Sequence, residues 1–125
     1  MNAPTKKHIL IVDDEANIRE LLEEFLTQNG YRVTPAQSAI EAHKVARTDP
    51  PNLIISDLQL EDSDGLDMIK SLKETLPNTP MMLLTGVLFD PKVVRDTLSK
   101  KVSCYLDKTA SLSQILAEVQ RLLPN

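Results

Sequence analysis

The stretch Asn52-Leu53-Ile54-Ile55-Ser56-Asp57-Leu58 is a short apolar run that ends on a carboxylate, and it sets the expected fold. Short continuous apolar runs are typical of strands that are covered on both faces, as in a parallel sheet. Three other runs also end on polar residues: Ile9–Val12 before Asp13 and Asp14, Met81–Leu84 before Thr85, and Val102–Leu106 before Asp107 and Lys108. We therefore expect strands whose polar ends gather at one edge of a sheet.

Between these runs the apolar residues recur with the period of amphipathic helices. The first expected helix begins near Asn17 and ends before Gly30, with an apolar face of Ile18, Leu21, Leu22, Phe25 and Leu26. Tyr31–Thr34, with Pro35 after it, suits an edge strand. The other expected helices carry Ile40, Ala42, His43 and Ala46; Leu66, Ile69, Leu72 and Leu76; Val93, Val94, Thr97 and Leu98 after Asp90-Pro91; and Leu112 to Leu123 after a Ser111/Gln114 capping box.

A strand followed by a helix, repeated along the whole chain, predicts an α/β fold with a mostly parallel sheet and helices on both faces. We expect one domain over residues 1–125, with its core in about residues 7–123. Ligand sites in such sheets lie beyond the carboxyl ends of the strands. Asp13, Asp14, Asp57, Thr85 and Lys108 are all expected there.

Composition excludes several classes of protein. With 125 residues, 42% hydrophobic and 26% charged, the chain suits one globular domain. A net charge of −4 argues against nonspecific nucleic-acid binding, which needs a basic surface. No apolar run is long enough to span a bilayer, and the N-terminus has no signal-peptide pattern, so we expect a cytoplasmic protein without membrane insertion. The single cysteine, Cys104, excludes an internal disulfide.

The expected cluster of carboxylates indicates chemistry on phosphate. Asp13, Asp14 and Asp57 would repel one another unless cations compensate them, and Lys108 with one divalent metal ion balances their charge. Oxygen ligands favour Mg²⁺ or Mn²⁺. A carboxylate in such a site can attack phosphorus, because the metal and the lysine neutralise charge on the phosphoryl oxygens. The hydroxyl of Thr85 is placed to contact the same group.

These residues, taken together and in order, resemble the receiver domain of two-component response regulators, the fold of the bacterial chemotaxis regulator. The resemblance runs from Lys7 to Leu123. It is carried by Asp13-Asp14 after the first strand, Asp57 with Asp64-Gly65 downstream, Thr85-Gly86, and Tyr105 three residues before Lys108. The resemblance implies a flavodoxin-like (βα)5 fold with strand order 2-1-3-4-5.

It also implies a role for each matching residue. Asp57 would accept phosphate from a histidine kinase or a histidine phosphotransfer protein. Mg²⁺ would be bound by Asp14, Asp57 and the backbone carbonyl of Gln59, with Asp13 acting through water. Lys108 would pair with Asp57 and then with the phosphoryl group, and Thr85 and Tyr105 would form the switch. The downstream partner would be a target protein or a fused output domain.

Two residues depart from the family pattern. Glu61 stands where the family usually has proline, which adds a negative charge near the expected metal loop. Thr109 stands where the family has a proline after a cis peptide bond. Because a cis bond before a non-proline residue costs about 3–4 kcal/mol, a trans bond is the alternative, and it would place Lys108 differently.

Other functions compete with this interpretation. A degenerate receiver would dock a partner without being phosphorylated. A haloacid-dehalogenase-like phosphatase would need an Asp-x-Asp pattern after its first strand, where this chain has Asp13-Asp14-Glu15. A nucleotide- or flavin-binding module would need a glycine-rich phosphate loop, and the chain has only 3 glycines. We expect self-phosphorylation and autodephosphorylation, and no turnover of an external substrate.

Overall fold

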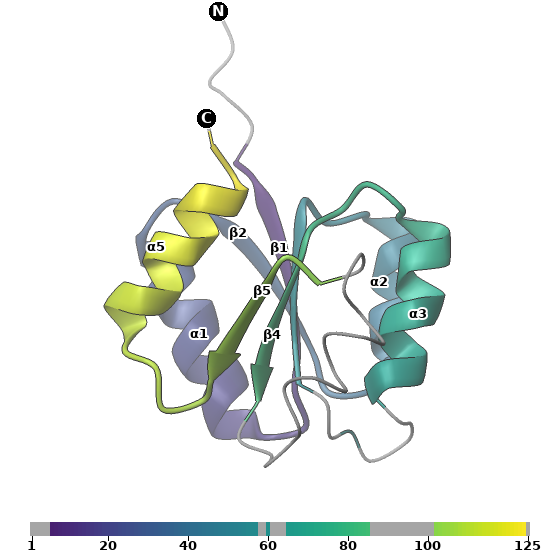
Figure 1. Ribbon diagram of the computed structural model, residues 1–125, viewed down its shortest axis with the longest axis horizontal. Helices are drawn as coiled ribbons and strands as arrows, with labels where there is room; N and C mark the ends of the chain where they lie inside the picture. Colours follow the sequence, from purple (N-terminus) through teal and green to yellow (C-terminus); the bar gives the residue numbers. More distant parts are fainter. Residues whose placement is uncertain (1–5, 58–59, 61–64, 86–101, 125) are drawn as a thin grey trace, which may run out of the picture.

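The computed structural model describes residues 6–57, 60, 65–85 and 102–124, which include a five-stranded parallel sheet (Figure 1). Its strands lie in the order β2-β1-β3-β4-β5. Their bounds are β1 His8–Val12, β2 Arg32–Ala36, β3 Leu53–Ser56, β4 Met81–Thr85 and β5 Cys104–Asp107. The predicted doubly wound sheet and its strand order 2-1-3-4-5 are confirmed.

The helices of the described ranges are α1 Ala16–Gln28, α2 Ala39–Thr48, α3 Gly65–Thr75 and α5 Leu112–Leu122. The capping box predicted at the start of α5 is present, because the Ser111 side chain accepts the Gln114 N–H and the Gln114 side chain accepts the Ser111 N–H. Gly30 follows the end of α1 with φ of 95°, a conformation that favours glycine. The helix expected after Asp90-Pro91 falls outside the described residues. None of the described helices is long and apolar enough to cross a membrane.

Alternate residues of each central strand point to opposite faces of the sheet, and each face has its own core. Ile9 and Ile11 of β1 pack with Leu22 and Leu26 of α1 and with Ile115 and Val119 of α5. Leu10 and Val12 pack with the other pair of helices, through Ala42 and Ala46 of α2 and Ile69 and Leu72 of α3. Figure 1 shows α1 and α5 on one side of the sheet and α2 and α3 on the other.

The prediction that Leu21 and Ile40 face the core is wrong. Leu21 is 47% exposed and Ile40 is 73% exposed. Each lies next to a buried residue of the same helix, Leu22 or Ala39, and one residue corresponds to about 100° of rotation around a helix. The buried stripe of each helix is therefore narrower than its run of apolar residues.

The two outer strands differ from their predicted bounds. β2 continues through Pro35 to Ala36, since Ile11 pairs with Pro35 and Val12 with Ala36. As an edge strand, β2 pairs only with β1, so a proline that lacks the N–H is tolerated there. β5 begins at Cys104 and includes Asp107, which pairs with Thr85. Val102 is buried in the core on the α2 and α3 side, ahead of the strand.

The register of the sheet brings the ends of β1 and β3 together. Val12 pairs with Ala36 on one side and with Ser56 on the other. The next residue of each central strand is a carboxylate, Asp13 or Asp57. The N–H of Asp13 donates to Ala36 O at 3.1 Å, and the N–H of Asp57 donates to Val12 O at 3.0 Å. The backbone ladder thus continues to the two acidic residues.

Candidate functional site: carboxylates at the carboxyl edge of the sheet

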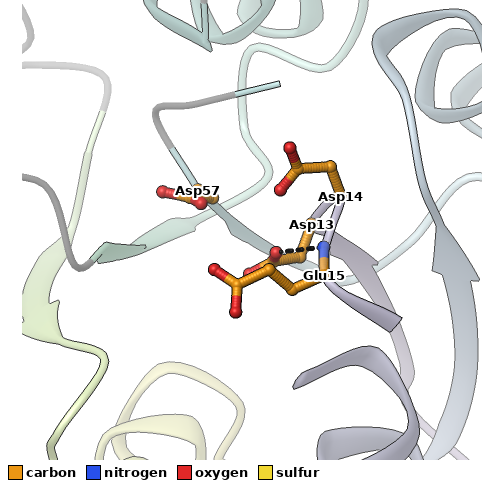
Figure 2. A group of neighbouring side chains, drawn as sticks. All are labelled: Asp13, Asp14, Glu15 and Asp57. Carbon is orange, nitrogen blue, oxygen red and sulfur yellow. Dashed lines mark hydrogen bonds between the residues drawn. The ribbon is translucent and has the colours of Figure 1, made fainter. Parts of the chain in front are cut away.

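Four carboxylates from two elements meet at this edge. Asp13, Asp14 and Glu15 lie on the turn between β1 and α1, and Asp57 lies at the end of β3 (Figure 2). Each of the four offers an oxygen that is within 4.8 Å of the others. Asp13 and Asp57 are each only 3% exposed, Asp14 is half-buried, and Glu15 is exposed. The structure thus brings together the three predicted acidic residues and adds Glu15, which the sequence analysis did not include.

Lys108 reaches this cluster from the end of β5. Its Nζ lies 2.8 Å from Asp57 Oδ2, 3.0 Å from Asp13 Oδ2 and 2.7 Å from Glu15 Oε1. The lysine side chain is 12% exposed, so these carboxylates replace most of the water around its ammonium group. The predicted pairing of Lys108 with Asp57 is present in the structure.

Burial and the ion pairs move two pKa values. Burial raises the pKa of Asp13 above its ordinary value, which outweighs the hydrogen bonds from the Glu15 N–H and from Lys108. Burial alone would lower the pKa of Lys108, but hydrogen bonds to Asp57, Glu15 and Asp13 dominate and raise it. Lys108 therefore stays protonated across the physiological range and supplies a permanent positive charge.

The acidic turn is held by its own backbone and by one arginine. The N–H of Glu15 donates to Asp13 Oδ1 at 2.9 Å. Arg19 Nη1 donates to the carbonyl oxygen of Asp13 at 2.6 Å, from the first turn of α1. The sequence analysis missed Arg19, although a cation four residues after Glu15 is on the same helical face as the acidic turn.

The Lys108–Thr109 peptide bond is trans, since no cis peptide occurs within the described ranges. The Thr109 N–H donates to Asp107 Oδ1 at 2.8 Å, which shapes the turn after β5. With this trans bond Lys108 still points into the carboxylate cluster. The departure at Thr109 therefore does not remove the lysine from the site.

The remaining predicted residues are placed only in part. Thr85 is the last residue of β4, and its side chain is outside the described part of the structure, as are Gln59 and Glu61. Tyr105 lies in β5, half-buried, and packs against the core formed with α2 and α3. Its strand neighbour is Leu83, two residues before Thr85.

The donor set of this cluster suits a hard divalent cation. Its potential ligand atoms are carboxylate oxygens, and among the described residues no histidine or cysteine joins the group. Two oxygens on opposite sides of one Mg²⁺ are about 4.2 Å apart. One carboxylate oxygen from each of the four residues lies within 4.8 Å of the other three, which is close to that separation. Four negative charges and one lysine leave an excess of negative charge that such a cation would reduce. The acidic cluster could therefore bind a metal ion.

Comparisons of the sequence with a family model and with curated proteins both identify response regulators. The response regulator receiver domain family matches residues 9–120. The response regulator MprA of Mycobacterium ulcerans (strain Agy99) is 32% identical over an alignment of 122 residues, and the match covers 92% of this chain and 49% of MprA. The chain thus spans about half the length of the curated relatives it matches.

Solved structures agree in fold. The chemotaxis response regulator CheY4 of Vibrio cholerae superposes with a TM-score of 0.86 at 26% identity, over 95% of this chain and 100% of CheY4. The BeF3-activated receiver domain of DrrB superposes with a TM-score of 0.84 at 28% identity, over 97% of this chain and 100% of that domain.

Proposed function

Because the chain belongs to the response regulator receiver domain family, we propose that Asp57 takes a phosphoryl group from a histidine kinase or a histidine phosphotransfer protein. One observation carries this proposal: the carboxylate of Asp57, 3% exposed at the end of β3, accepts from Lys108 Nζ at 2.8 Å beside three further carboxylates. The family match assigns the chain to signalling receivers rather than to enzymes that turn over an external substrate. It also argues against the phosphatase and nucleotide-binding alternatives.

In the proposed transfer, a carboxylate oxygen of Asp57 attacks the phosphorus of a phosphohistidine. The new P–O bond forms as the P–N bond breaks, and the imidazole nitrogen leaves with that electron pair. Later, a water molecule attacks the same phosphorus, which regenerates the carboxylate and releases inorganic phosphate. The domain then returns to its unphosphorylated state.

Lys108 serves this step through its fixed positive charge. Its ammonium group lies beside Asp57 Oδ2, where negative charge from the incoming phosphoryl oxygens would gather. We further propose that Thr85 contacts the phosphoryl group and that Tyr105 follows this movement as the switch. The positions of these residues on the neighbouring strands β4 and β5 support this extension.

The proposed metal is Mg²⁺ or Mn²⁺. Asp14, Asp57 and the carbonyl of Gln59 would bind it directly, and Asp13 would act through water. When bound, this ion neutralises charge on the phosphoryl oxygens and orients them. The chemistry of the carboxylate cluster supports this choice, since hard oxygen ligands prefer hard cations.

The partners of the domain follow from the same proposal. Phosphorylation adds negative charge and acceptor oxygens at the carboxyl edge of the sheet, and a receiver passes that change to a partner surface. We propose that this surface includes β5 and α5, and that it faces a downstream protein or an output domain rather than nucleic acid. The relatives, about twice as long as this chain, leave room for such an output domain.

The test is intact mass spectrometry after incubation with acetyl phosphate and Mg²⁺. The wild type should gain about 80 Da, the mass of one phosphoryl group. Asp57→Asn and chelation of the metal should abolish the gain. Asp67→Asn, which makes the same change on the exposed surface of α3, should retain it. If the folded wild type neither gains mass nor binds beryllofluoride, an analogue of the phosphoryl group, then phosphorylation-independent docking is the correct interpretation.

A further inference from the structure

The three protons of the Lys108 ammonium group are already matched by three acceptors. An ammonium group has three N–H donors and no acceptor. In the structure Lys108 Nζ contacts Glu15 at 2.7 Å, Asp57 at 2.8 Å and Asp13 at 3.0 Å. A phosphoryl group on Asp57 would take over the contact between Lys108 and Asp57, so a further phosphoryl oxygen can gain a hydrogen bond from Lys108 only if Asp13 or Glu15 withdraws.

The three partners differ in how readily they can withdraw. The side chain of Asp13 is 4% exposed and is held by the Glu15 N–H, and Asp57 is itself the proposed acceptor. The side chain of Glu15 is 59% exposed. Water can solvate its carboxylate as soon as it leaves the lysine, whereas a buried carboxylate that loses its partner bears the full cost of desolvation. Glu15 is thus the partner that can leave.

We propose that Glu15 is a positioning residue that holds Lys108 in the unphosphorylated domain and competes with the phosphoryl group for it. This inference rests on the proposed function of Asp57. In the resting domain Glu15 fills the third hydrogen-bonding position of Lys108. Phosphorylation replaces the Lys108–Glu15 contact with a Lys108–phosphoryl contact, so the strength of the ion pair opposes phosphorylation.

Glu15 also affects the metal, in the opposite direction. Its carboxylate oxygen lies within 4.8 Å of the oxygens of Asp13, Asp14 and Asp57. The added negative charge attracts a divalent cation to this cluster. Removal of the charge at position 15 should therefore weaken metal binding while it frees Lys108 for the phosphoryl group.

Three variants separate these effects. Glu15→Gln removes the charge and the ion pair. Glu15→Asp keeps the charge but withdraws it from Lys108 by about 1.5 Å, the length of one carbon–carbon bond. An aspartate at this position, the N-cap of α1, can instead accept the free N–H groups of the helix. Glu20→Gln makes the same chemical change as Glu15→Gln at an exposed position of α1 and is the control.

Two affinities are measured for each protein. Mn²⁺ affinity is measured by electron paramagnetic resonance of the free ion, and beryllofluoride affinity at saturating Mg²⁺ is measured by calorimetry. Glu15→Gln should bind beryllofluoride about two- to fivefold more tightly, as expected for loss of a partly exposed ion pair, and should bind Mn²⁺ more weakly. Glu15→Asp should show the same gain for beryllofluoride with Mn²⁺ affinity close to wild type, and Glu20→Gln should change neither.

Three results overturn the inference. If Glu15→Asp matches the wild type toward beryllofluoride while Glu15→Gln does not, the effect comes from charge alone and not from the ion pair. If Glu15→Gln weakens both affinities, Glu15 only supports the shape of the turn. If the wild type binds Mn²⁺ but neither binds beryllofluoride nor gains a phosphoryl group, the proposed function itself fails and this inference fails with it.

Discussion

Lys108→Met removes the ammonium group that lies between Asp13 and Asp57 and tests how the carboxylate cluster is stabilised. The methionine keeps most of the apolar stem, so the variant changes charge more than packing. The two aspartates that lose this partner have side chains only 4% and 3% exposed. Removal of one partner from a buried ion pair costs 3–5 kcal/mol, and the lower end, about 3 kcal/mol, applies here because the lysine is still 12% exposed.

Unfolding in urea measures this cost. With a slope of about 1.5 kcal/mol per molar urea for a domain of this size, the midpoint should fall by about 2 M at neutral pH. The chain has no tryptophan, so far-ultraviolet circular dichroism is the suitable signal. Lys44→Met, at an exposed position of α2, is the matched control and should leave the midpoint almost unchanged.

The pH dependence gives the loss a specific signature. Burial already raises the pKa of Asp13, and without the hydrogen bond from Lys108 the pKa of Asp13 should rise further. A carboxyl group whose pKa is higher in the folded state favours folding when protonated, so stability from this source is lost as pH rises. The deficit of the variant should therefore be largest at neutral pH and smaller near pH 5. Mg²⁺ should stabilise the variant more than the wild type, because the variant has one more net negative charge at the site.

Two results would refute this reasoning. One is a urea midpoint for Lys108→Met that equals that of the wild type at neutral pH. The other is a deficit that is the same at neutral pH and near pH 5, which would mean that the loss comes from packing rather than from uncompensated carboxylates.

Three further predictions concern stability away from the site. Leu72→Ala, at a fully buried position of α3, should cost about 2–5 kcal/mol in urea unfolding, whereas Leu21→Ala, at a 47% exposed position of α1, should cost less than about 0.5 kcal/mol. Ser111→Ala removes the acceptor for the Gln114 N–H and should cost about 1 kcal/mol, with Ser113→Ala as an exposed control on the same helix. Burial, with the nearby charge of Arg32, lowers the pKa of His8, whose Nε2 lies 2.7 Å from Thr34 Oγ1. The free energy of unfolding should therefore fall as pH drops through and below the ordinary histidine pKa of about 6.5. In His8→Gln the free energy of unfolding should depend less steeply on pH over this range, which checks the assignment.

Much of the fold could be predicted from local patterns. The run Leu53–Ser56 ends at the predicted residue and forms β3, because a short apolar run between polar segments can be buried on both faces only inside a sheet. The same pattern located β1 and β4. Where one face of a helix is only partly covered, periodicity was not sufficient: Leu21 and Ile40 belong to apolar runs but lie beside the buried stripe rather than in it.

The acidic site could be predicted in the same way, but only in part. Parallel strands have their carboxyl ends at one edge, so residues that follow β1 and β3 are expected to meet there, as Asp13 and Asp57 do. Lys108 was placed at this edge by the same argument. Its contacts with three carboxylates, and its entry through a trans peptide bond, depend on the path of the turn after β5.

The amino-acid sequence alone was enough to predict the alternation of strands and helices, the edge at which polar residues collect, and three of the acidic residues there, Asp13, Asp14 and Asp57. These follow from local hydrophobic period and from the geometry common to parallel sheets. The contacts that Lys108 makes with Glu15, Asp13 and Asp57 are known only from the folded arrangement of the chain. The physical reason is distance along the chain: Glu15 and Lys108 are 93 residues apart, and no local pattern shows which acceptors an ammonium group from another strand will meet.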